Sequence, residues 1–173
     1  KGIYFTSMGW NRRGFKFLDK TDRKQIDGMS LYFGKAYQDL TRSVMIEPRQ
    51  VHAQSYMIEI LMNFNQGEEI ERLLKSALAY RPESLTARWY YLTTMLPRWG
   101  GSIDKMAAFV QSTRSYYKRN ATLKVLDGRV AAEFGDQNYF AGNYTRAFEF
   151  YTDALKSGDH WYYNNRRAEV LFS

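Results

Sequence analysis

Residues 141–155, AGNYTRAFEFYTDAL, carry the clearest structural signal in the chain. Apolar side chains recur there at intervals of three and four positions, which places them on one face of a helix. They are Tyr144, Ala147, Phe148, Tyr151, Ala154 and Leu155. Gly142 and Asn143 come just before this face and predict a turn. The stretch therefore predicts an amphipathic helix that begins after a tight turn.

The same periodicity runs through residues 68–80, EEIERLLKSALAY, where Ile70, Leu73 and Leu74 lie on one face. Arg81 and Pro82 predict the end of this helix, because proline restricts the residue before it and cannot continue the turn. Strand signals are scarce in the rest of the sequence. The fold class that these patterns predict is all-α.

Composition limits the kind of protein this is. A chain of 173 residues can form one domain or a short array of repeats. Its 45% hydrophobic and 25% charged residues are usual for a globular protein. The chain contains no cysteine, which excludes disulfides, thiolate metal sites and cysteine nucleophiles. No apolar run approaches the roughly eighteen residues that span a bilayer, so we expect no membrane span.

Small and aromatic residues repeat at the spacing that two packed antiparallel helices require. Helices approach closely only where side chains are small, and large rings fill the space beyond. Between about residues 128 and 161 these positions are occupied by Gly135, Gly142, Tyr144, Ala147, Tyr151 and Ala154. In this pattern the chain resembles the tetratricopeptide repeat (TPR) family. Arg13-Gly14 and the PRWGGS segment are also similar to a bacterial branch of TPR-like proteins of unknown function.

The resemblance implies a right-handed α-α superhelix of helix hairpins and a single repeat domain over residues 1–173. The implied units are approximately 4–48, 51–82, 85–120, 128–160 and a partial unit 161–173. The first unit would have Trp10, Gly14 and Phe17 in its first helix. Because a solenoid normally ends in a polar capping helix and this chain stops within a repeat, we expect it to be a fragment of a longer chain.

The segment LPRWGGS, residues 96–102, is the most unusual in composition. Pro97 ends a helix, the two glycines allow a tight turn, and Ser102 is a suitable N-cap, so a corner between helices is the favoured interpretation. The alternative is an anion held by the backbone N–H groups of GGS, with help from Arg98. Ser102 to Lys105 also fits the S-x-x-K motif of penicillin-recognising enzymes, but the partner motifs S-D-N and K-T-G are missing.

Nothing else in the sequence indicates catalysis. His52 and His160 are far apart, and neither has the nearby partner expected of a metal site on a helix. The glycine-rich phosphate-binding motifs and the G-x-S-x-G nucleophile motif are absent. We therefore expect no enzyme activity, no metal and no cofactor.

The resemblance to TPR proteins implies binding in a concave groove, lined by set positions of the first helix of each unit. In this chain those positions include Asn11, Ser55, Glu59, Trp89, Arg129, Asp136, Tyr139, Tyr162 and Asn165. Trp89, Tyr139 and Tyr162 would anchor a peptide. Arg129 and Asn165 would hold its polar groups. The alternative is that the rings only pack between helices. The Lys and Asn set that clamps a terminal carboxylate in some TPR proteins is not found.

The net charge of +7 and the pI of about 9.5 favour an acidic partner. Short basic runs such as Asn165, Arg166 and Arg167 are explained by solvated helix faces. The leading hypothesis is a non-catalytic adaptor or regulator that binds a protein or peptide, in its sharper form an immunity or chaperone-like protein for a secreted toxin. The alternative is nucleic-acid binding, favoured by the aromatic rings and cationic side chains of residues 114–119.

The sequence does not determine the oligomeric state. The cytoplasm is the favoured compartment, and the periplasm is the alternative if a leader has been removed.

Overall fold

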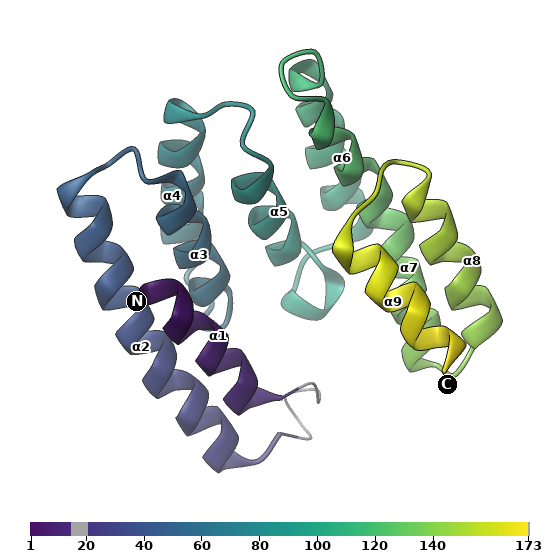
Figure 1. The fold of residues 1–173 in the computed structure, drawn as a ribbon, viewed down its shortest axis with the longest axis horizontal. Helices are drawn as coiled ribbons and strands as arrows, with labels where there is room; N and C mark the ends of the chain where they lie inside the picture. Colours follow the sequence, from purple (N-terminus) through teal and green to yellow (C-terminus); the bar gives the residue numbers. More distant parts are fainter. Residues whose placement is uncertain (15–20, 173) are drawn as a thin grey trace. The chain divides into compact units, whose positions relative to one another are not determined.

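The structure is a computed structural model that describes residues 1–14 and 21–172. Within these residues the chain forms α-helices and short 3₁₀ helices and no strand, so the predicted all-α class is confirmed (Figure 1). The α-helices are α1 (Gly2–Arg13), α2 (Arg23–Ile46), α3 (Val51–Met62), α4 (Gly67–Tyr80), α5 (Leu85–Thr94), α6 (Ile103–Thr113), α7 (Arg129–Phe140), α8 (Tyr144–Leu155) and α9 (Trp161–Leu171). None of the helices in the described part of the chain is both long and apolar enough to cross a membrane.

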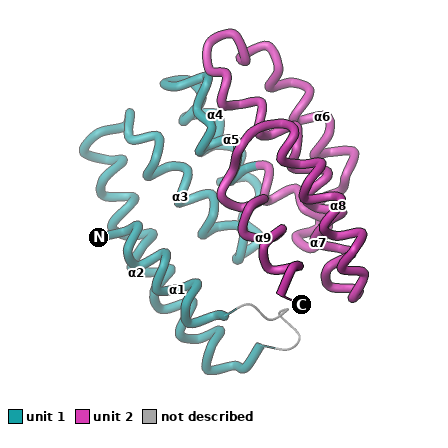
Figure 2. Tube along the Cα trace, turned by 45° about the vertical axis from the view of Figure 1, so that its right-hand side comes forward, with its two compact units in different colours: residues 1–91 teal, residues 92–173 magenta. Residues whose placement is uncertain are grey.

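The chain divides into two compact units, Lys1–Tyr91 and Leu92–Ser173 (Figure 2). In three of the predicted pairs, the two helices are consecutive in the sequence and pack against each other: α1 with α2, α3 with α4, and α7 with α8. The boundary between the units falls inside α5, within the residues of the third predicted pair. Inside the second unit α6 packs on α7 and on a 3₁₀ helix, η4 (Ala121–Gly128).

The helices predicted from residues 68–80 and 141–155 are both confirmed. The first is α4, which buries Ile70, Leu73, Leu74 and Ala77 and ends before Arg81. The second is α8, which begins at Tyr144 after the turn at Gly142 and buries Ala147, Tyr151 and Ala154. A Cβ atom added to Gly135 of α7 would lie 2.6 Å from the ring of Tyr151. Glycine is therefore what lets α7 and α8 approach, as the repeat pattern requires.

The first helix is shorter than the repeat pattern predicted. The prediction that Gly14 lies within this helix is wrong, because α1 ends at Arg13 and Gly14 has a φ of 70°. Backbone with positive φ leaves the right-handed helix, and glycine adopts it at little cost. Phe17 lies outside the described residues. Helix α2 starts at a capping box in which Asp22 and Gln25 satisfy each other's backbone N–H groups.

The segment LPRWGGS forms a corner, as its composition favoured. Residues Pro97–Trp99 make a short 3₁₀ helix, η2, and Gly100 follows in the left-handed conformation with a φ of 83°. Ser102 caps α6, and its hydroxyl oxygen accepts a hydrogen bond from the backbone N–H of Lys105. The S-x-x-K spacing of Ser102 and Lys105 is thus used for helix capping.

Candidate interaction site around Asp136

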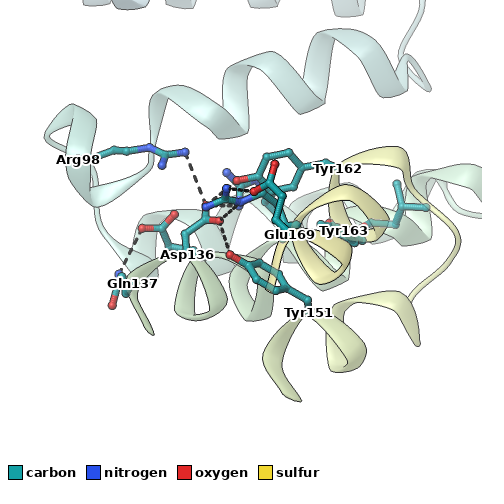
Figure 3. Close-up of polar contacts among 11 residues, drawn as sticks. Arg98, Asp136, Gln137, Tyr151, Tyr162, Tyr163 and Glu169 are labelled. Carbon is teal, nitrogen blue, oxygen red and sulfur yellow. Dashed lines mark hydrogen bonds and ion pairs between the residues drawn. The ribbon is translucent and has the colours of Figure 1, made fainter. Parts of the chain in front are cut away.

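Asp136 of α7 is the centre of the densest polar cluster in the second unit. Its side chain is almost fully buried, yet both carboxylate oxygens receive hydrogen bonds (Figure 3). The hydroxyl of Tyr151 donates to Oδ1 at 2.8 Å, and the hydroxyl of Tyr162 donates to Oδ2 at 2.6 Å. Arg166 of α9 donates to Oδ1 through Nε at 3.1 Å. Helices α7, α8 and α9 therefore meet at one carboxylate.

Two further guanidinium groups face the same carboxylate. Nη2 of Arg98 in the corner η2 lies 3.7 Å from Oδ2, and Nη1 of Arg129 lies 4.0 Å from it. The Arg129 side chain is 2% exposed and that of Arg166 is 16% exposed, whereas the Arg98 side chain is 33% exposed. Arg98 is therefore the most exposed of the three guanidinium groups.

Aromatic rings support the buried cations. The guanidinium carbon of Arg129 lies 4.8 Å from the ring centroid of Tyr162, and that of Arg166 lies 4.7 Å from the ring centroid of Tyr139. Such distances allow cation–π attraction, which is stronger away from water. Burial also raises the pKa of Tyr151 and of Tyr162. Both hydroxyls therefore stay protonated at neutral pH and act as donors to Asp136.

Two other carboxyl groups belong to the cluster. Glu133 of α7 is buried, and burial raises its pKa although Arg129 and Arg98 act to lower it. Its Oε1 accepts a hydrogen bond of 3.2 Å from Gln137 Nε2. Glu169 pairs with the second side of the Arg166 guanidinium and is half-exposed. Three guanidinium groups and three carboxyl groups therefore share this part of the second unit.

The structure brings several of the predicted groove residues together. Arg129, Tyr139 and Tyr162, with Asp136, belong to this one cluster in the second unit. Asn165 of α9 is exposed, as is Asn11 of α1, and Trp89 of α5 is partly buried. Ser55 is fully buried and donates to the carbonyl of Val51, so a partner cannot reach its hydroxyl. Glu59 belongs to a separate cluster in the first unit.

The sequence did not predict that Arg166 and Arg98 form ion pairs with Asp136. The expectation of a solvated face is wrong for Arg166, which contacts Asp136 and lies near the rings of Tyr139 and Tyr151. The spacing of Tyr162 and Arg166, four residues apart on a helix, was the available signal, since such residues share a face. For Arg98 no local signal existed, because its partner lies on a helix far along the chain.

His160 has a structural role, as its isolation in the sequence indicated. It precedes α9, and its Nδ1 accepts a hydrogen bond from the backbone N–H of Tyr162. Burial, aided by the charge of Arg129, lowers the pKa of His160 to about 4, so the ring is neutral at pH 7 and can accept this bond. Within residues 1–14 and 21–172, no three His, Asp or Glu side chains gather in a way that would hold a metal ion.

In comparisons with known proteins, one segment of the chain matches a protein family. Residues 65–118 match the family model described as a domain of unknown function, DUF4034. The matched segment covers less than a third of the chain and includes α4, α5, the LPRWGGS corner and α6. No curated protein matches the chain, and no solved structure matches it either. The similarity therefore concerns a segment and brings no activity with it.

Proposed function

We propose that the chain is a non-catalytic protein-interaction module of TPR-like helix pairs, arranged as a right-handed superhelix, whose second unit binds an acidic segment of a partner protein. The sequential pairing of α1 with α2, α3 with α4 and α7 with α8 supports the repeat architecture. So does the close approach of α7 and α8 at Gly135. The partner class follows from the cluster around Asp136 and from the net charge of +7.

The single observation that carries this proposal is the convergence of three guanidinium groups on Asp136. One carboxylate has room for about four hydrogen bonds, and Asp136 already accepts three. Arg98 makes an ion pair with it at 3.7 Å, but no hydrogen bond to any residue that the structure describes. Its fork of donors therefore has capacity for a second carboxylate, which guanidinium binds in a two-point geometry.

A binding measurement with a matched control tests the proposal. A fluorescein-labelled peptide of alternating Glu and Gly is titrated with the protein, and anisotropy gives the dissociation constant. We expect Arg98→Gln to weaken binding about tenfold, which corresponds to the loss of one charge-assisted contact. The control is Arg146→Gln, which removes the same charge from an exposed position on α8. Equal weakening by both variants would mean that net charge alone attracts the peptide and would contradict the proposal.

Nucleic-acid binding is the second candidate, and exposed cations beside rings favour it. In residues 114–119, Arg114 pairs with Asp127 at 3.0 Å, whereas Lys118 and Arg119 are exposed near the partly buried Tyr116 and Tyr117. On the first unit the Tyr32 ring lies within 5.9 Å of Arg12 and 5.6 Å of Lys35. Tight binding of single-stranded oligonucleotides, falling steeply with salt, would favour this function over the peptide-binding one.

A further inference from the structure

Three aromatic rings lie together at the turn between α7 and α8. Phe140, the last residue of α7, is 47% exposed, and Tyr144, the first residue of α8, is 41% exposed. The ring centroid of Tyr139 is 5.6 Å from that of Phe140 and 5.6 Å from that of Tyr144. We call these three residues the aromatic patch. Large rings gathered at a surface are typical of a contact with a partner.

The aromatic patch borders the carboxylate that Arg98 faces. Asp136 and Phe140 are four residues apart on α7, so they share a face and are separated by about 6 Å along the helix axis. Arg166 connects them: its Nε donates to Asp136, and its guanidinium carbon lies 5.4 Å from the ring centroid of Phe140. A ligand held at Arg98 is therefore within a few residues of the patch.

The charges around Asp136 distinguish the two ends of this surface. Arg98 lies at one end, and the half-exposed Glu169 lies on the other side of the cluster, paired with Arg166 (Figure 3). A carboxylate of a partner is attracted to Arg98 and repelled by Glu169. Because Arg166 contacts both Glu169 and the aromatic patch, the patch suits an uncharged side chain better than a second acidic one.

We propose that the acidic segment bound by the second unit carries an aromatic residue two positions from its acidic residue, and that Phe140 and Tyr144 receive this ring. The proposal rests on the proposed function, since the acidic group is held at Arg98. In an extended peptide, side chains two positions apart point to the same side and are about 7 Å apart. This spacing matches the separation of Asp136 and Phe140 along α7. Neither Phe140 nor Tyr144 is among the groove positions that the repeat pattern predicted.

Two labelled peptides of equal charge test this proposal by fluorescence anisotropy. Both alternate Glu and Gly, and the central Glu is replaced by Phe in one peptide and by Ala in the other. We expect the wild type to bind the Phe peptide about tenfold more tightly, because a ring gains apolar burial and edge-on or offset contacts. Phe140→Ser should remove most of this gain, and Tyr144→Ser a part of it. The control Tyr80→Ser removes a ring of the same 47% exposure from the end of α4 and should leave the gain intact.

The Ala peptide separates this proposal from the proposed function. If Arg98→Gln weakens its binding but the Phe peptide binds no more tightly, the acidic-segment site stands and the aromatic patch has no role in binding. A gain that is undiminished in folded Phe140→Ser and Tyr144→Ser variants would also overturn the inference. If neither peptide binds the wild type, both proposals are wrong.

A measurement on the wild type keeps the test valid if the variants fold poorly. Intermolecular nuclear Overhauser effects between the ring of the Phe peptide and protein rings show where the peptide ring lies. We expect them to Phe140 and Tyr144. Effects to Trp161 instead, an exposed ring at the start of α9, would overturn the proposal.

Discussion

The two units bury a carboxyl group in contrasting surroundings. Glu59 in the first unit accepts a hydrogen bond from an indole and lies beside a tyrosine, and burial raises its pKa to about 7. Asp136 in the second unit faces three guanidinium groups within 4.0 Å. Cations offset the cost of burying Asp136, whereas among the residues that the structure describes no cation contributes to the pKa of Glu59. The comparison shows that one unit buries a carboxyl group among aromatic donors and the other buries one among guanidinium groups.

The strongest way to break this comparison is to remove the charge of Asp136. Asp136→Asn leaves the buried Arg129 and the mostly buried Arg166 without their anion, so we expect a loss of about 3–5 kcal/mol in the free energy of unfolding. Urea denaturation measures it. Asp153→Asn is the control, because its exposed ion pair with Lys156 is worth at most about 1 kcal/mol. Equal losses in the two variants would show that the cluster is not anchored by Asp136.

The pH dependence of stability tests the part of the comparison that concerns Glu59 in the first unit. Burial raises the pKa of Glu59 in the fold to about 7, above its ordinary value of 4.5. Its contribution to stability is therefore complete below pH 4.5 and is lost as the pH rises through 7. Relative to Glu59→Gln, the wild type should lose about 2–3 kcal/mol of unfolding free energy between pH 5 and pH 8. Urea titrations at both pH values measure the difference, and parallel behaviour of the two proteins would contradict it.

The smallest expected effect separates binding from stability within the arginine cluster. Arg98 is one-third exposed and makes a long ion pair, so Arg98→Gln should change the free energy of unfolding by at most about 1 kcal/mol. The same variant is expected to weaken binding of the acidic peptide. Thermal unfolding of the variant beside Arg146→Gln checks this prediction. A loss as large as that of Asp136→Asn would assign Arg98 to the structural core of the cluster instead.

Local sequence patterns were sufficient for the individual helices. Helix α8 follows from the spacing of Ala147, Tyr151 and Ala154, and the corner at residues 96–102 follows from Pro97 and the N-cap at Ser102. These features depend on backbone preferences and on side chains within one or two turns. The end of α1 was missed because a glycine within a helical pattern fits both a close approach and a helix stop.

The candidate site was predictable only in part. The repeat register placed Arg129, Asp136 and Tyr139 on one helix, and their convergence with Tyr162 is observed. Arg98 and Trp10 find their carboxyl partners on distant helices, and no spacing within a single helix encodes such pairs. A binding partner that is a secreted toxin stays a prediction, because charge alone does not name a partner.

The measurement that tests the central claim most directly is an NMR titration of the arginine side chains with the acidic peptide. The Nε–Hε resonances report each guanidinium separately and need no mutation. The account predicts that Arg98 and Arg166 shift together and saturably, while the exposed Arg146 of α8 does not move. Small shifts spread over exposed arginines of both units, with Arg98 no different from Arg146, would contradict a defined acidic-segment site around Asp136.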